Sequence, residues 1–278
     1  MEFKIKISMA NKNKIKVTIA GATGWAGSAL SKGVVGSSDL ELVSAVSRKS
    51  AGENLSKILN LNNCDIPVFA TIAEALKISC DVLVEYTKPE IAKGNIISAL
   101  NNGVNVVVGT SGLTDEDYEK INSIAKKNNK AVLAVGNFAI TAVLLQKFSE
   151  MAAKYIPNSE IIDFAGESKI DAPSGTVREL AYRIGQIRES HLDVPLDMVK
   201  GPIGIRGARL NETQIHSVRL PGYSISVEAI FGLPGEKLSI KHDAGSSPEP
   251  YVQGALLAIR KVNTFIGLKR GLDSVMEF

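Results

Sequence analysis

The stretch IKVTIAGATGWAG, residues 15–27, decides the fold of this chain. It opens with a β-branched strand candidate at residues 15–20, followed at once by Gly21, Gly24 and Gly27 and then by a helical pattern. Glycines between a strand and a helix let the backbone approach a phosphate closely, and the helix N-terminus favours negative charge. The spacing G-x-x-G-x-x-G is weak evidence by itself, because a tight strand–helix turn has the same pattern. Its surroundings favour a dinucleotide phosphate site.

The first half of the chain alternates short apolar runs with helical patterns. The expected strands are residues 15–20, 40–47, 68–70, 81–86, 104–108 and 131–135. The expected helices are residues 27–36, 71–78, 89–101 and 114–127. This rhythm predicts an α/β fold, with a Rossmann-like parallel sheet between two layers of helices.

The pattern changes after Phe138. Helices are expected at residues 141–155, 176–187 and 250–262, and extended segments at residues 160–165, 203–207, 213–220, 223–231 and 237–243. Proline–glycine turns separate the later segments, which predicts an α+β region with a mostly antiparallel open sheet. The expected domains are a dinucleotide-binding domain (1–138), a substrate-binding and oligomerisation domain (139–246), and a C-terminal helix (247–278) that packs back on the first domain.

Composition excludes several classes of partner. The chain has 278 residues and a net charge of +3, which does not call for nucleic acid or a membrane surface. No run reaches the roughly 18 apolar residues of a membrane span, and residues 1–13 lack the features of a signal peptide and suggest a short arm. Cys64 and Cys80 form neither a metal-ligand spacing nor a disulfide framework, so we expect no metal and a cytoplasmic location.

The end of the second strand bears on the choice of cofactor. An acidic residue there would bind the ribose hydroxyls of NAD, but this chain has Arg48 and Lys49 between serines. Two cations suit the 2′-phosphate of NADPH. The alternatives are a solvated basic loop and NADH as the cofactor.

Other strand ends are expected at the same edge of the sheet, because ligands of open parallel sheets bind outside the carboxyl ends of the strands. Thr87 and Gly109 are candidates to contact the nicotinamide ribose and ring. The glycine loop, the basic turn and these strand ends together give the residues expected to hold the cofactor. They are Gly21, Thr23, Gly24, Trp25, Ala26, Arg48, Lys49, Thr87, Gly109 and Thr110.

The most specific stretch is KIDAPSGT, residues 169–176, which we term the octet. A cation is followed by a turn and then by Ser174, Gly175 and Thr176 at a helix start. Hydroxyl and free amide groups there would hold a carboxylate, and Lys169 would add positive charge. A plain helix cap by Asp171 or Ser174 is the alternative for any single residue, although it does not require the whole octet.

The octet resembles the K-x-D-A-P-S-G-T signature of the 4-hydroxy-tetrahydrodipicolinate reductase (dihydrodipicolinate reductase) family of lysine biosynthesis. The resemblance covers nearly the whole chain. It includes the glycine loop, residues 86–89, 109–112 and 136–138, the octet, Arg206-Gly207 followed by His216, and the closing helix.

The resemblance implies a Rossmann-like domain with a substrate domain whose open sheet builds a homotetramer. It also implies hydride transfer from NADPH or NADH to a carboxylate-bearing cyclic imine, giving tetrahydrodipicolinate. Lys169, Ser174, Gly175 and Thr176 would hold a substrate carboxylate and Ser111 would stand nearby. Asn137 and Phe138 match a cofactor-binding element.

One departure concerns the proton donor. Family members carry a His-His pair ahead of the octet, whereas this chain has Ala165 and Gly166, which cannot donate a side-chain proton. Lys169 is the preferred replacement, if desolvation lowers its pKa. Glu167 would share its face only if strand alternation continues. The remaining alternatives are a bound water and the histidines, which are His191, His216 and His242.

Three functions remain open at the level of sequence. The first is the family activity without the usual histidine, and the second is a related reductase acting on another imine or keto acid. The third is a dinucleotide-binding homologue that no longer catalyses, against which the intact octet argues.

Overall fold

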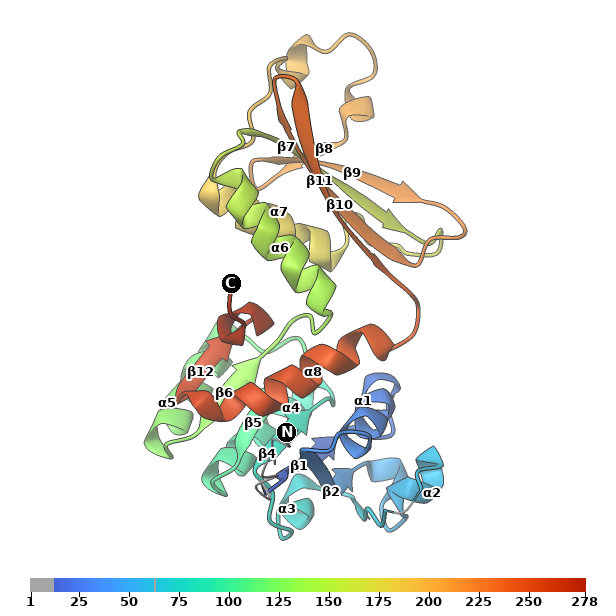
Figure 1. Cartoon of the computed structure of the whole chain (residues 1–278), viewed down its shortest axis with the longest axis vertical. Coiled ribbons are helices and arrows are strands. Elements are labelled where there is room, and N and C mark those ends of the chain that lie inside the picture. The colour runs from blue at the N-terminus through green and yellow to red at the C-terminus, as the bar shows by residue number, and fades with distance from the viewer. Residues whose placement is uncertain (1–12, 63) are drawn as a thin grey trace, which may run out of the picture. The chain divides into compact units, whose positions relative to one another are not determined.

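The computed structural model describes residues 13–62 and 64–278, which form two compact units (Figure 1). The first comprises the described residues up to Gly136 together with Tyr251–Phe278, and the second is Asn137–Pro250. The arm expected over residues 1–13 lies, apart from Asn13, outside the described residues.

The first unit is built on a parallel sheet of seven strands in the order β12-β6-β5-β4-β1-β2-β3. The strands are β1 (Ile15–Ala20), β2 (Leu40–Val46), β3 (Val68–Phe69), β4 (Val82–Glu85), β5 (Asn105–Val108), β6 (Ala131–Ala134) and β12 (Gly267–Arg270). The helices are α1 (Trp25–Val35), α2 (Leu55–Leu59), α3 (Ile72–Ala75), α4 (Pro89–Asn101), α5 (Asp115–Lys127) and α8 (Glu249–Lys261). The predicted Rossmann-like sheet is confirmed.

The central strands are almost wholly buried, as expected for a parallel sheet covered on both faces. Residues 82–85 and 106–108 are buried along their whole length. Helix α5 starts where its sequence predicts, because Thr114 and Asp117 form a capping box in which each side chain accepts from the other residue's amide.

Helix α8 packs beside α1 within the first unit. The guanidinium of Arg260 makes two hydrogen bonds with Asp39, at 2.7 and 2.8 Å. A Cβ on Gly33 would come within 2.5 Å of Val252 Cγ1, so the two helices approach closely at that glycine. The edge strand β12, which the sequence pattern does not predict, pairs in parallel with β6.

The second unit has a five-stranded sheet in the order β11-β10-β7-β9-β8. Its elements are α6 (Ile140–Ala153), β7 (Asn158–Ala165), α7 (Gly175–Ile187), β8 (Ala208–Leu210), β9 (Thr213–Arg219), β10 (Ile225–Leu233) and β11 (Glu236–Ala244). Neighbouring strands are antiparallel except for β7 and β9, which run parallel, so the predicted mostly antiparallel sheet is confirmed.

Helices α6 and α7 lie together against one face of this sheet (Figure 1). Alternate residues of β7 point to that face, so its burial alternates strictly along the strand. Ile161, Leu180 and Phe231 are fully buried in the core between the sheet and the helices.

The prediction of an extended segment at residues 203–207 is wrong. Ile203–Arg206 forms a 3₁₀ turn, and the strand begins only at Ala208. Gly207, with φ of 72°, makes the change of direction, and a Cβ there would lie 2.1 Å from Ile215 O. Glycine is required at this bend because the backbone is left-handed and closely approached.

Candidate functional site

The glycine loop joins β1 to α1, and its glycines are needed for close packing. Gly21 has φ of 80°, and a Cβ on it would lie 2.2 Å from Tyr86 O. A Cβ on Gly27 would lie 2.1 Å from Gly21 O, whereas Gly24 is less restricted at 3.2 Å. The loop can therefore adopt this shape only with glycine at the first and last positions.

Helix α1 begins directly after this loop, and its first turn has amide donors without intrahelical acceptors. Gly24 is the N-cap and supplies no side-chain acceptor, and the first turn has no acidic residue. The amide groups of Trp25 and Ala26 have no intrahelical acceptor by helix geometry, so they are available to an anion. The ring of Trp25 is 58% exposed and packs edge-on against Tyr251, with centroids 5.8 Å apart.

The end of β2 lies beside the glycine loop. The hydroxyls of Thr23 and Ser47 are 2.9 Å apart, which joins the loop to the second strand. Arg48 and Lys49 follow on an exposed 3₁₀ turn, Arg48–Ser50. This geometry places two cations next to the strand end where the adenosine ribose of a dinucleotide is recognised.

The end of β4 carries a buried acid, Glu85, which the sequence reading did not single out. Its carboxylate accepts hydrogen bonds from the Thr87 amide at 2.9 Å, the Thr87 hydroxyl and the Asn95 side chain at 2.9 Å. Burial raises the pKa of Glu85, while the hydrogen bonds from Thr87, Asn95 and Thr110 oppose that rise. A charged residue ending an otherwise apolar strand is the sequence signal that identifies it.

The end of β5 approaches the same place. Thr110 is buried, and its hydroxyl donates to Glu85 O at 3.2 Å. Gly109 N donates to the same carbonyl at 3.0 Å, and Ser111 is exposed. The structure therefore brings together Thr87, Gly109 and Thr110 within the first unit.

In the second unit, the octet forms the turn between β7 and α7. Ser174 is the N-cap of α7, and its hydroxyl accepts from Val177 N at 3.4 Å. The amide groups of Gly175 and Thr176 lie in the first turn, where helix geometry leaves them without intrahelical acceptors. Ser174 is therefore a cap, and the next two residues offer donors to an anion.

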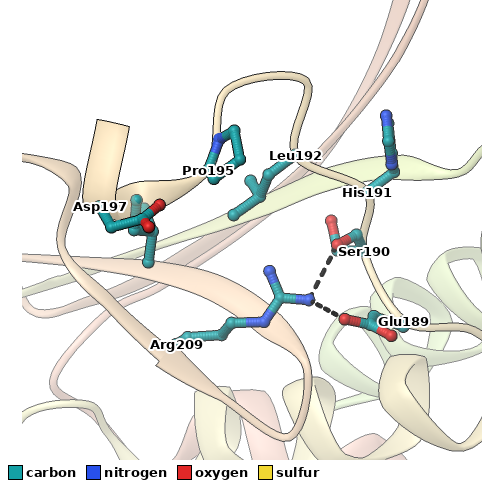
Figure 2. Close-up of a pocket in the computed structure, with 8 residues that line it drawn as sticks. Glu189, Ser190, His191, Leu192, Pro195, Asp197 and Arg209 are labelled. Carbon is teal, nitrogen blue, oxygen red and sulfur yellow. Dashed lines mark hydrogen bonds and ion pairs between the residues drawn. The ribbon is translucent and has the colours of Figure 1, made fainter. Parts of the chain in front are cut away.

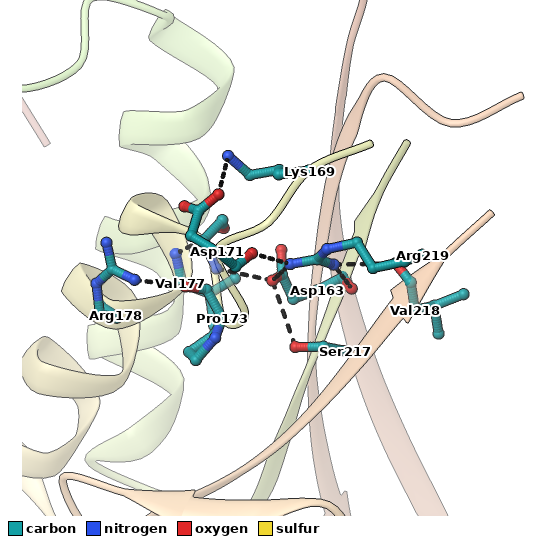
Figure 3. Close-up of polar contacts among 10 residues, drawn as sticks. Asp163, Lys169, Asp171, Pro173, Val177, Arg178, Ser217, Val218 and Arg219 are labelled. Atoms are coloured by element: carbon teal, nitrogen blue, oxygen red, sulfur yellow. Dashed lines mark hydrogen bonds and ion pairs between the residues drawn. The ribbon is translucent and has the colours of Figure 1, made fainter. Parts of the chain in front are cut away.

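A buried ion pair braces the octet from the sheet side (Figure 3). The carboxylate of Asp163 on β7 accepts from Ser174 N at 2.8 Å and pairs with Arg219 Nη2 at 2.7 Å. Arg219 also donates to Asp171 O at 2.7 Å and to Asp163 O at 3.1 Å. Asp163 and Arg219 thus hold both sides of the turn, and the sequence reading missed both residues because they lie 56 positions apart.

Lys169 lies at the start of the octet and pairs with Asp171. Their Nζ and Oδ1 atoms are 2.8 Å apart, and the side chains are 32% and 39% exposed. The hydrogen bond from Lys169 is the main cause that lowers the pKa of Asp171. The ammonium group of Lys169 is therefore only partly desolvated and has a carboxylate partner.

The sequence Ala165-Gly166 ends β7 directly before this turn. Ala165 is 1% exposed and shares its face with Asp163. A Cβ on Gly166 would lie 3.1 Å from Tyr223 O. The condition for Glu167 to share this face is not met, because β7 ends at Ala165 and Lys169 N bonds back to Gly166 O in a turn.

The histidines are each engaged elsewhere. His216 Nε2 lies 2.7 Å from Glu160, which also binds Arg206. His242 is buried with its Nδ1 2.9 Å from the Thr141 hydroxyl, and burial lowers its pKa. Exposed His191 lies 3.1 Å from Asp193.

Two cavities of about 650 and 440 Å³ lie in the second unit at the opposite end of β7 from the octet. Figure 2 shows the larger, where Arg209 donates to Glu189 and to Ser190 O at 2.8 and 3.0 Å. Ser159, at the second cavity, and Ala165 are six positions apart along β7, a span of about 20 Å. The cavities are thus remote from the predicted chemistry.

Asn137 and Phe138 begin the second unit. The Asn137 side chain accepts from Ala139 N at 2.9 Å, and Phe138 is 4% exposed. Among the described residues, no group of three or more histidine, cysteine or acidic side chains could hold a metal. None of the described helices combines the length and apolar character needed to cross a bilayer.

Comparisons with known proteins agree over almost the whole chain. The family model "Dihydrodipicolinate reductase, N-terminus" matches residues 15–138, and "Dihydrodipicolinate reductase, C-terminus" matches residues 141–274. A 4-hydroxy-tetrahydrodipicolinate reductase of Listeria monocytogenes serotype 4b is 36% identical over 264 residues, covering 95% of this chain and all of the relative. One from Lactococcus lactis subsp. cremoris is 38% identical over 265 residues, covering 95% and 98% of the two chains.

A solved structure extends the likeness to three dimensions. The dipicolinate-bound dihydrodipicolinate reductase of Paenisporosarcina sp. TG-14 superposes with a TM-score of 0.86 at 32% identity, covering 95% of this chain and all of the other. The likeness in fold therefore extends over both the glycine loop and the octet. The chain belongs to the dihydrodipicolinate reductase family of NAD(P)H-dependent reductases in the diaminopimelate route to lysine.

Proposed function

We propose that this chain reduces a cyclic imine bearing a carboxylate, the 4-hydroxy-tetrahydrodipicolinate type of substrate, with NADPH in preference to NADH. The observation that carries the proposal is the braced octet, where Gly175 and Thr176 offer amide donors and Lys169 lies at the start of the same turn. A carboxylate is the group that such donors and a cation recognise together. The relative from Paenisporosarcina is described as bound to dipicolinate, a carboxylate-bearing ring compound.

The cofactor loop fits a dinucleotide phosphate. At Gly21 and Gly27 no side chain obstructs the approach of a phosphate to the backbone. The first turn of α1 carries no acidic residue that would repel an anion. Thr23, Gly24, Trp25 and Ala26 would surround the phosphates, and Thr87, Gly109 and Thr110 the nicotinamide side, with Asn137 and Phe138 as further cofactor contacts. When bound, the cofactor supplies the hydride.

The preference for NADPH rests on Arg48 and Lys49. Both are exposed, and neither forms an ion pair within residues 13–62 and 64–278. A 2′-phosphate would give these cations the charge partner that NADH lacks.

Lys169 is the proposed proton donor to the reduced nitrogen. Its ammonium carries three protons, and one of them is directed to Asp171 Oδ1, which lies 2.8 Å from Nζ. The others are free to bind a substrate carboxylate or to protonate the nitrogen, and Ser111, Ser174, Gly175 and Thr176 complete the proposed substrate contacts. A general acid contributes about 10²–10⁴-fold to a rate.

The alanine and glycine before the octet favour one second candidate, a reductase of the same kind acting on another imine or keto acid. With Ala165 and Gly166 in place of two imidazoles, the residues directly before the octet differ from the family pattern. A substrate that needs a different proton donor would suit this arrangement.

The proposal includes a homotetramer in the cytoplasm. Half-buried Ile162, Phe164 and Ile230 occupy the sheet face opposite α6 and α7, where a second copy would cover them. Cys64 and Cys80 are free thiols, which agrees with a reducing compartment.

The test mixes the purified chain with NADPH or NADH and the precursor made in place by the aldolase of the pathway, and follows the nicotinamide absorbance. Oxidation well above background, faster with NADPH, supports the proposal. Background rates with that precursor, but turnover of another cyclic imine or of a 2-keto acid with ammonium, would establish the second candidate. Cofactor binding without turnover of any of them would indicate a non-catalytic homologue.

A further inference from the structure

The buried acid Glu85 has a more specific role than completing a strand. It is the last residue of β4 and is 0% exposed. A carboxylate at such a position is costly unless its oxygens accept hydrogen bonds. The structure meets that requirement with groups from three different segments.

The donors come from the residues that surround the carboxyl ends of the strands. Oε1 accepts from the amide and hydroxyl of Thr87. The hydroxyl of Thr110 lies 3.5 Å from Oε1 and makes its shorter bond, at 3.2 Å, to the Glu85 carbonyl oxygen. Oε2 accepts from Asn95 of α4 at 2.9 Å. Glu85 thus joins the ends of β4 and β5 to α4.

This arrangement fixes the direction of the Thr87 hydroxyl. A hydroxyl has one proton to donate, and that of Thr87 is directed to Glu85. Its lone pairs remain, so toward any further partner Thr87 acts as an acceptor. The groups that suit it are donors, such as a ribose hydroxyl or the carboxamide NH₂ of nicotinamide.

We propose that Glu85 is a positioning residue for the nicotinamide half of the cofactor, acting through the hydroxyl of Thr87. This inference rests on the proposed function, because it takes NADPH as the ligand of the first unit. What matters is an acceptor at this position, so the role should survive loss of charge but not loss of both oxygens.

Wild type and two variants of the full chain test the proposal, with binding followed by the fluorescence of NADPH. Glu85→Met removes the acceptor oxygens and is expected to raise the dissociation constant of NADPH about tenfold. This is the effect expected from the loss of one hydrogen bond to a charged group. Glu85→Gln keeps an oxygen for Thr87 while the Asn95 amide turns, and should bind within about threefold of wild type. An adenosine bisphosphate without the nicotinamide half should bind all three equally.

A double-mutant cycle shows whether Glu85 acts through its neighbour. Thr87→Val removes the hydroxyl, and Thr87→Ser retains it. If Thr87 mediates the effect, Glu85→Met in the Thr87→Val background adds little further loss, because contacting residues are not additive. Thr87→Ser should weaken NADPH binding less than Thr87→Val does, and equal binding by these two variants would overturn the inference even if Glu85→Met folds poorly.

The outcomes are distinct. If wild type fails to bind NADPH, both the proposed function and this inference are overturned. If wild type binds and Glu85→Met binds NADPH equally well, only the inference is overturned. If Glu85→Met weakened the binding of NADPH and of the adenosine fragment equally, Glu85 would have a general structural role and the inference would be overturned. Full additivity of Glu85→Met with Thr87→Val would overturn the inference too.

Discussion

Arg219 Nη2 lies 2.7 Å from Asp163 Oδ2, and this ion pair joins two parallel strands to the turn that begins α7. The Asp163 side chain is fully buried and that of Arg219 is 16% exposed. Removing one partner of a buried pair leaves an uncompensated charge. The position of the octet therefore depends on two residues outside it.

We expect Arg219→Met to lower the free energy of unfolding by about 3–5 kcal/mol, because Asp163 would keep its burial and lose its cation. Urea denaturation measures this loss. Arg270→Met is the control, since Arg270 and Asp115 form a pair with side chains 61% and 87% exposed, worth about 1 kcal/mol or less. Equal losses in the two variants would contradict the account.

Lys169→Met is expected to lower kcat/KM about 10²–10⁴-fold, because it removes the proposed acid and a cation that binds the substrate. Lys169→Arg should retain substrate binding better than kcat, since arginine keeps the charge but does not release its proton. Exposed Lys154→Met is the control in the same unit. If Lys169→Met changed only KM, the proton would come from elsewhere, such as a bound water.

Arg48→Ala together with Lys49→Ala is expected to weaken NADPH binding about tenfold or more and to leave NADH nearly unchanged, because only NADPH carries the 2′-phosphate. The ratio of the two dissociation constants is the measurement. Lys77→Ala changes an exposed lysine of the same unit and should not alter that ratio. An unchanged ratio in the Arg48 and Lys49 variant would leave the basic turn without a role in cofactor choice.

Ala165→His is expected to destabilise the chain by about 1–3 kcal/mol and not to raise kcat, since an inserted ring overpacks a filled site. Ala165 is 1% exposed, beside the Asp163–Arg219 pair. Thermal unfolding and the reductase assay check the two parts. A stable variant with faster turnover would show that the site has room for an imidazole.

Asp117 makes stability depend on pH below the ordinary range of an aspartate. The hydrogen bond from Lys93, with the bonds to Thr114, lowers the pKa of Asp117 from 3.8 to about 2. The ionised form is therefore favoured in the folded state, so its contribution is present above pH 3.8 and is lost as pH falls toward 2. Asp117→Asn should remove this dependence from unfolding curves, while exposed Glu116→Gln should keep it.

Local sequence determined much of the fold. The β-branched run of β1 and the proline at the start of α4 give element bounds that match the predicted residues 15–20 and 89–101. Both signals are carried by neighbouring residues, because strand propensity and a proline at the first helical position act locally. The glycine loop and the octet were found for the same reason.

Other elements depend on partners that are distant in the sequence. The edge strand β12 is only Gly267–Arg270 and is defined by pairing with β6, so its own pattern is too short to indicate a strand. The turn at residues 203–206 differs from the predicted extended segment because its shape follows from the bend at Gly207 against β9.

By itself, the sequence determined that a dinucleotide loop and a carboxylate-binding octet occur in one α/β chain, since each is a contiguous motif whose chemistry lies in its own residues. Only the tertiary structure decided what holds them in position. Glu85 gathers Thr87 and Thr110 at the strand ends, and Asp163 with Arg219 braces the octet. The partners of a buried charge are brought together by folding, and sequence spacing does not reveal those pairings.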